Sequence, residues 1–278
     1  MEELLERSRD FLAPPAAAVT PRERRKRQAK IVVVVALACF VVKTSSGHAA
    51  QTQTLGLGVT PTKLKKNRKS PVAVTITAVT ANETAPNRIP SPTTIARFNF
   101  DDDFHFNGTS GVTGTCEPEM VENLSTALAI QQCPNAVLGS GSAKARFPWL
   151  LNGNPWYQEV DAELTAFKGS PDPGTGYPRL VIFTRVETAG FGSSLLGTLK
   201  PAGAGPDFGT RLEITVPEFI SGFAALTRFS IKIGTGAGRG YASAKCSDRD
   251  HRLNLNGRIT YKNGSTLPAK ASSRCFPV

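Results

Sequence analysis

Residues 211–216 read Arg-Leu-Glu-Ile-Thr-Val, and this stretch decides the fold class. Leu212, Ile214 and Val216 alternate with charged or hydroxyl side chains. Because successive side chains of a strand point to opposite faces, this period of two indicates a strand with one buried face. The same period recurs along the chain, in residues 72–77, 96–100, 104–106, 180–187, 229–233 and 253–261.

Turn-forming residues separate these strand-like runs. Residues 169–178 and 200–209 are rich in Gly and Pro, and Asn263-Gly264 suits the centre of a tight hairpin turn. Many short strands with frequent turns predict a mainly β protein. We expect an antiparallel β-sandwich over residues 71–278, with a two-sheet jelly roll as one form of it. A sheet closed on itself and a pair of smaller domains are the alternatives.

The first 50 residues have the order of a secretory signal. A basic segment (residues 1–30) precedes an apolar run of 12 residues, Ile31–Val42, and small residues at Gly47 and Ala49 suit cleavage before Ala50. As a helix this run spans about 18 Å, against about 30 Å for the hydrocarbon layer of a membrane. We therefore assign residues 31–49 to the signal core and cleavage region, and expect a secreted or cell-envelope protein.

An uncleaved signal anchor is the main alternative, because Lys43 and the basic flank fit a single-pass protein with its C-terminal domain outside. In that case the membrane is contacted only through the N-terminal segment. A start codon placed too early would explain the length of the basic segment, and lipidation at Cys39 is a further alternative.

Four cysteines follow the signal region: Cys116, Cys133, Cys246 and Cys275. An even number of cysteines in an exported chain predicts disulfides. Three pairings are possible, and sequence distance favours Cys116–Cys133 with Cys246–Cys275. A zinc site is disfavoured, because no Cys-x-x-Cys pair occurs.

The residues between Cys116 and Cys133 have a helical period instead. One straight helix would hold its ends about 20 Å apart, whereas a disulfide needs Cα atoms about 4.4–6.8 Å apart. Two short helices resolve this conflict, since Pro118 suits a first helical turn and Ser125 or Thr126 suits an N-cap. We predict a helical hairpin inserted at about 117–133.

The part of the chain after the signal is basic. Residues 1–49 hold nine basic and five acidic side chains, so 24 basic and 17 acidic ones remain. We expect residues 50–70 to be a tether that carries five clustered cations: Lys63, Lys65, Lys66, Arg68 and Lys69. Such a cluster favours contact with anionic envelope polymers or headgroups, and a solvated tether is the alternative. No aromatic residues interrupt it, so nucleic acid is not expected.

Asp101, Asp102 and Asp103 form the one candidate metal site. Carboxylates are calcium ligands, but the spacing is not that of an EF-hand, and a solvated strand end also explains three acids. No other cofactor is expected.

A candidate ligand-binding region lies further along the chain. Glu159, Asp161 and Glu163 fall on one face of a predicted strand, and paired carboxylates hydrolyse glycosidic bonds. Aromatic side chains that can stack on sugars or close a core precede them: Trp149, Trp156 and Tyr157. The solvated face of an amphipathic strand is the simpler interpretation of the acids.

No catalytic residue is assigned. The chain lacks a Gly-x-Ser-x-Gly elbow, and only His105 and His251 follow the signal region. We therefore expect a non-enzymatic envelope or extracellular protein that scaffolds or binds surface polymer. The alternative is a carbohydrate-binding module or a weak glycoside hydrolase.

Several short sequence segments resemble those of a family of uncharacterised exported β-rich proteins of high-GC actinobacteria. They are Cys116-Glu-Pro, residues 133–143 (Cys-Pro-Asn-Ala-Val-Leu-Gly-Ser-Gly-Ser-Ala), Phe208-Gly-Thr-Arg-Leu and residues 226–234 (Leu-Thr-Arg-Phe-Ser-Ile-Lys-Ile-Gly). The resemblance covers most of residues 55–278. It implies export, two disulfides and a β architecture, and it lends no activity and no catalytic residue.

Overall fold

The strands follow the predicted alternation of buried and exposed side chains.

The computed structural model describes residues 51–82, 89–106, 112–151, 154–203, 205, 207–218, 224–247 and 250–278, without the side chains of 149–156 and 237. The predicted signal segment therefore lies outside the described residues. Among those that are described, no helix has the length and hydropathy of a membrane span.

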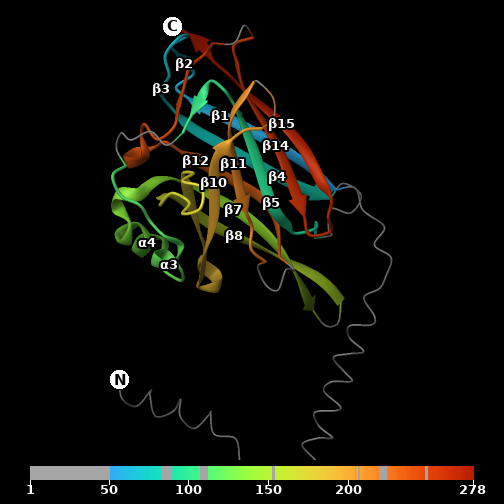
Figure 1. Ribbon diagram of the computed structural model, residues 1–278. Coiled ribbons are helices and arrows are strands. Elements are labelled where there is room, and N and C mark those ends of the chain that lie inside the picture. Colours follow the sequence, from blue (N-terminus) through green and yellow to red (C-terminus); the bar gives the residue numbers. More distant parts are fainter. Residues whose placement is uncertain are drawn as a thin grey trace, which may run out of the picture. The chain divides into compact units, whose positions relative to one another are not determined.

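Most of the described strands belong to one large antiparallel sheet. In chain order its members are β1 (Gln51–Thr60), β4 (Ala73–Asn82), β5 (Thr93–Asp101), β7 (Val137–Leu151), β8 (Asn154–Gly169), β9 (Arg179–Val186), β10 (Phe191–Pro201), β11 (Phe208–Thr215), β12 (Ala225–Ile233), β14 (Arg252–Tyr261) and β15 (Thr266–Arg274). In space the order is β1-β4-β12-β7-β8-β9-β10-β11-β5-β14-β15 (Figure 1).

Two small sheets complete the β structure. One joins β3 (Ser70–Pro71), β13 (Ser243–Ala244) and β6 (Phe104–His105), and the other pairs β2 (Lys63–Leu64) in parallel with β16 (Phe276–Pro277). Short 3₁₀ turns lie at η1 (Pro134–Ala136), η2 (Glu187–Ala189) and η4 (Gly236–Gly238).

The large sheet curls over one core. Its first and last strands, β1 and β15, pack against each other. The inner face carries the buried apolar side chains, for example Phe98, Phe100, Leu212 and Ile231, which are each at most 2% exposed. The predicted mainly β, antiparallel fold is therefore confirmed. Hydrogen bonds connect all eleven strands of this sheet. The β layers on the two sides of the core are therefore parts of one sheet.

The predicted helical hairpin is also confirmed, as α3 (Pro118–Val121) and α4 (Thr126–Gln132). Ser125 caps α4 by accepting a hydrogen bond from the backbone N–H of Leu128. Asn123 adopts a left-handed φ of 62°, which turns the chain between the helices.

The hairpin covers the outer face of the sheet at β8 and β9. A second apolar cluster forms there between the hairpin and the strands, with Val121 and Ala129 from the helices and Phe167, Val181 and Phe183 from the sheet. Figure 1 shows both helices on one side of the sheet, next to β8.

The predicted tether at 50–70 is wrong for its first half. Gln51–Thr60 is strand β1, which pairs with β4 from Gln51↔Asn82 to Thr60↔Ala73. Leu55 and Leu57 pack against the core, while Thr and Gly occupy the alternate positions. Those small polar residues look like a linker in sequence, but they lie on the outer face of the sheet.

Candidate functional site

The basic segment (residues 63–69) is held against the end of the domain. Lys63 and Leu64 pair with Phe276 and Pro277 as β2 and β16, and the side chain of Leu64 is 1% exposed. The N–H of Val278 donates to the carbonyl of Leu64, at 2.9 Å. Figure 1 shows β2 and β3 at the same end of the domain as the C-terminus. The second half of the predicted tether is therefore an anchored loop.

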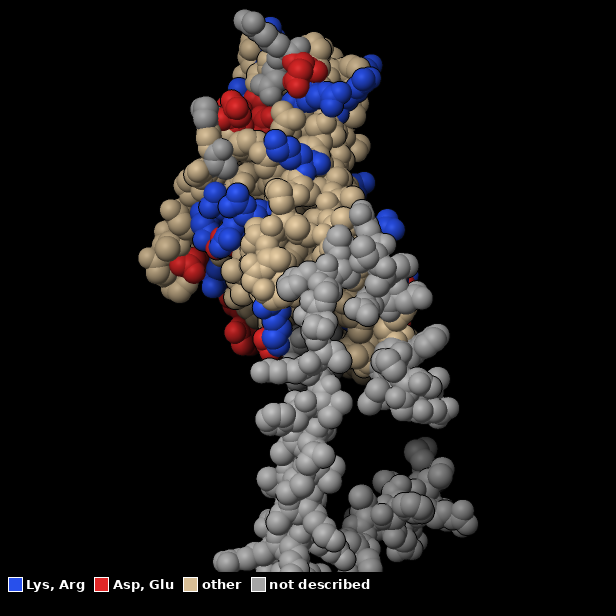
Figure 2. Space-filling view, turned by 90° about the vertical axis from the view of Figure 1, so that its right-hand side faces the viewer, with Lys and Arg blue, Asp and Glu red and all other residues tan. Residues whose placement is uncertain are grey.

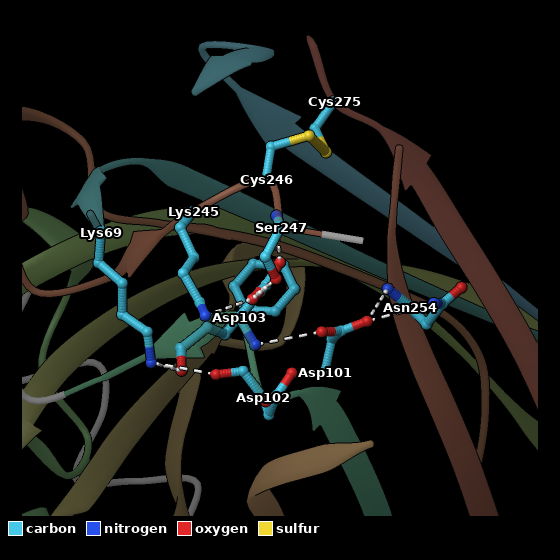
Figure 3. A network of polar contacts seen from close by, with 10 residues as sticks. Lys69, Asp101, Asp102, Asp103, Lys245, Cys246, Ser247, Asn254 and Cys275 are labelled. Atoms are coloured by element: carbon cyan, nitrogen blue, oxygen red, sulfur yellow. Dashed lines mark hydrogen bonds and ion pairs between the residues drawn. A yellow bond between two sulfur atoms is a disulfide. The ribbon is translucent and has the colours of Figure 1, made fainter. Parts of the chain in front are cut away.

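All five cations predicted in this segment are exposed. The ammonium group of Lys69 donates to the backbone carbonyls of Asp102, at 3.0 Å, and Phe104, at 2.9 Å (Figure 3). The other four side chains have no hydrogen bond or ion pair with any described residue: Lys63, Lys65, Lys66 and Arg68. Most of the positive charge of the segment is thus available to a partner.

The disulfide between Cys246 and Cys275 is buried and adjoins the basic segment. Cys246 and Cys275 are bridged with Cα atoms 5.9 Å apart, and both are 1% exposed. The N–H of Cys246 donates to the carbonyl of Lys65, at 3.1 Å. The other bridge joins Cys116 to Cys133, with Cα atoms 5.6 Å apart, so the favoured pairing is confirmed.

The acidic turn at 101–103 bonds to the residues on either side of Cys246. Asp103 is fully buried, and it accepts hydrogen bonds from the backbone N–H and the hydroxyl of Ser247 as well as an ion pair from Lys245 (Figure 3). Asp101 is 2% exposed and accepts from the backbone and side-chain amides of Asn254, both at 3.2 Å.

These contacts give the turn a structural role. Its three carboxylates lie close enough for a metal, with one oxygen of each within 4.8 Å of the others. Both oxygens of Asp103 and both of Asp101, however, already accept bonds from protein groups. The solvated strand end that we considered is wrong for Asp101 and Asp103, because residues 245–247 and β14 cover them.

Two of the three predicted strand acids are committed to ion pairs. Glu159 pairs with Arg146 at 2.9 Å and with Lys144 at 3.3 Å, and Asp161 pairs with Lys144 at 3.0 Å. The hydrogen bond from Arg146 lowers the pKa of Glu159, and the bond to Asp161 raises the pKa of Lys144. The acid catalyst of a glycosidase needs a raised pKa, so Glu159 does not suit that role.

Glu163, the third acid on this exposed face of β8, lines a groove of about 450 Å³. The groove runs between α4 and strands β7 and β8, and Ile130 and Val137 line it. The hydroxyl of Thr126 donates to Glu163 at 2.8 Å. The three acids thus share one strand face, as predicted, but Glu159 and Asp161 bond to cations of β7 whereas Glu163 accepts from α4.

The aromatic residues lie at the tip of the β7–β8 hairpin. The backbones of Trp149 and Trp156 pair directly across the strands, but their side chains lie outside the described residues. The guanidinium of Arg146 lies 4.5 Å from the ring centre of Tyr157, a cation–π contact. Sugar stacking at this tip stays a prediction.

Sequence reasoning missed a second group of cations, which face outward from β10, β11, β5, β14 and β15: Lys200, Arg211, Arg97, Arg252, Arg258, Lys270 and Arg274. The alternation of Arg252, Asn254, Asn256 and Arg258 was the available signal, since it places four polar side chains on one face. The other cations join this face only through strand pairing.

Comparison of the chain with known protein families, with curated proteins and with solved structures gave no match. The resemblance to exported actinobacterial proteins therefore remains a prediction from the quoted phrases.

Proposed function

We propose that this chain is an exported, non-enzymatic protein that binds an anionic polymer of the cell envelope or extracellular space through residues 63–69. The carrying observation is the set of four exposed cations without a partner among the described residues, on a backbone fixed by strand pairing and hydrogen bonds. Two disulfides in a β-rich domain fit an oxidising compartment outside the cytoplasm.

Fixing the backbone strengthens such a site. A free tether would lose conformational entropy when it bound a polymer, whereas a segment already held in place loses less. The charges also act over a distance of about 10 Å at moderate ionic strength, so they can attract a polyanion before contact. The anchoring of residues 63–69 therefore supports a binding surface more than a spacer.

The ion pairs on the rest of the sheet support the same interpretation. Glu159 and Asp161 neutralise Lys144 and Arg146 on the face of β7 and β8. The positive charge of the basic segment has no such counterpart among the described residues. An external anion is the natural partner for it.

The test uses purified full-length protein and immobilised polygalacturonate as an anionic polymer. In the segment variant, Lys65, Lys66 and Arg68 are each replaced by Gln. In the control variant, three exposed cations without a partner among the described residues are replaced in the same way: Arg228, Lys232 and Arg239.

We expect the segment variant to bind about tenfold more weakly at 50 mM salt, because it loses three charge contacts. The control variant should stay within about twofold of the wild type. Equal losses in the two variants would show that only net charge matters, and absence of wild-type binding would refute the function.

A further inference from the structure

The outward faces of β11, β5, β14 and β15 form a continuous cationic face. Strand register places Arg97 beside Arg258, and Asn99 between Arg211 and Asn256. The next strand adds Lys270 opposite Asn256 and Arg274 opposite Arg252. We define the cationic face by its charged members on these four strands: Arg97, Arg211, Arg252, Arg258, Lys270 and Arg274.

Little of this charge is neutralised by the domain itself. Glu213 is the outward acid on these four strands in the described residues, and it already pairs with Lys200 at 2.7 Å and with Arg97. Asp101, at the end of β5, is buried and bonded to Asn254. Three cations have no hydrogen bond or ion pair with any described residue: Arg258, Lys270 and Arg274.

Two cations of this face, Arg252 and Arg274, form a cross-strand pair of like charge. The two residues lie directly opposite each other on β14 and β15, and both are exposed. Like charges in this position destabilise a sheet. The guanidinium of Arg252 donates to the hydroxyl of Ser272, at 3.1 Å, which leaves its charge unbalanced. A bound anion would relieve this repulsion.

The outward faces of four other strands, β7, β8, β1 and β4, carry paired charges or none. On β7 and β8, Lys144 and Arg146 are matched by Glu159 and Asp161. The outward positions of β1 carry Thr and Gly, and those of β4 carry Thr, Val and Ala. Strand β12 also carries two cations without a partner among the described residues, Arg228 and Lys232, but the cationic face gathers charged residues from four adjacent strands. Figure 2 views the side on which β14 and β15 lie in Figure 1, and Lys and Arg side chains occupy several places on it.

The side chains between the cations indicate the chemistry of the partner. Asn256, Thr260 and Ser272 face outward and offer amide and hydroxyl groups, which can bond to the hydroxyl groups of a sugar. No outward position of β14 or β15 holds an aromatic residue, so the stacking platform that single-stranded nucleic acids need is missing there. An exposed sheet face suits an extended chain better than a small molecule.

The cationic face adjoins the basic segment. Arg274 is followed by Cys275 and then by Phe276, which pairs with Lys63. The N–H of Phe276 also donates to the carbonyl of Thr62, at 2.8 Å. We infer that an acidic polysaccharide, carrying carboxylate or phosphate groups, lies across the cationic face and continues onto residues 63–69. This inference rests on the proposed function and adds the class of polymer and its path.

The experiment compares three triple variants of the full-length protein that change net charge equally. The face variant replaces Arg258, Lys270 and Arg274 by Gln, and the segment and control variants are those defined above. Binding is measured against polygalacturonate, neutral dextran, polyphosphate and vesicles of phosphatidylglycerol, at 50 and 200 mM salt. Thermal melting checks that each variant is folded.

We expect the face variant to bind polygalacturonate about tenfold more weakly than the wild type and with a shallower dependence on salt. Dextran should not bind. Replacing Asn256 by Ala keeps the charge and removes the amide, so it should weaken binding to polygalacturonate about threefold and leave polyphosphate unchanged.

Each contrary result has a distinct meaning. Wild-type affinity in the face variant, with a weakened segment variant, would overturn the inference and leave the proposed function intact. If no anionic probe binds the wild type, the proposed function fails and the inference fails with it. Tighter binding to the vesicles or to polyphosphate than to polygalacturonate would overturn the assignment of a polysaccharide.

Discussion

Asp103 accepts hydrogen bonds from both the backbone N–H and the hydroxyl of Ser247, although 144 positions separate the two residues. Ser247 follows Cys246, whose N–H bonds to Lys65. The buried carboxylate therefore holds the loop that in turn holds the basic segment. One acid of the predicted metal site, Asp103, thus also supports the segment that carries the exposed cations.

Replacing Asp103 by Asn should destabilise the domain by about 2–3 kcal/mol, because the amide group cannot accept from Ser247 with both of its atoms and no longer pairs with Lys245. Urea unfolding measures this change. Asp102→Asn is the matched control, since Asp102 is exposed, and it should cost less than about 0.5 kcal/mol. Equal effects of the two substitutions would contradict the supporting role of Asp103.

The two disulfides should contribute similarly to stability and differently to binding. Their cysteines are separated by 17 and 29 positions, for which loop closure predicts about 3 kcal/mol each. Removing Cys246–Cys275 with serines should also weaken polygalacturonate binding, because this bridge lies behind residues 63–69. Removing Cys116–Cys133 should leave binding unchanged at a temperature where both variants are folded.

Urea midpoints measure the stability of the two double-serine variants, and Kd values for polygalacturonate measure their binding. A loss of affinity in the Cys116–Cys133 variant as large as in the other would show that binding follows global stability. Unchanged affinity in the Cys246–Cys275 variant would show that strand pairing alone holds the basic segment.

Signal cleavage should leave the fold intact. A cut after Ala49 removes no residue of β1, which begins at Gln51. We expect N-terminal sequencing of protein recovered from its host to start at Ala50. A protein that retains residues 31–42 would instead support the anchor, and the domain would then be presented at a membrane surface.

Features fixed by local chemistry were predictable from sequence. The hairpin at 118–132 was predicted because Pro118, the Ser125 cap and the closure limit of the Cys116–Cys133 bridge all act within one short stretch. The individual strands were predictable for the same reason, since alternation is a local pattern.

Features that depend on distant pairing were not predictable. β1 looks like a tether until β4 pairs with it and its Leu side chains meet the core. The cationic face draws Arg97, Arg211 and Arg258 from three strands that are far apart in sequence. The burial of Asp103 depends on residues 245–247, which come from the other half of the chain.

Glu213 provides a test of the cationic face that depends on pH. Partial burial pushes the pKa of its carboxyl up, but hydrogen bonds from Lys200 and Arg97 outweigh burial and leave the pKa below the ordinary value of 4.5. A carboxyl with a lowered pKa in the folded state stabilises the fold above about pH 4.5, and this contribution is lost as the pH falls through the folded-state pKa.

Glu213→Gln should therefore be less stable than the wild type at pH 7, by about 1 kcal/mol, and nearly equal to it at about pH 3. Urea unfolding at both pH values measures the difference, with Glu119→Gln, an exposed site, as the control. Because the substitution also removes the outward acid that neutralises Arg97, it should tighten binding to polygalacturonate about twofold. A variant that is destabilised at pH 7 yet binds no better would show that the polymer does not reach this part of the sheet.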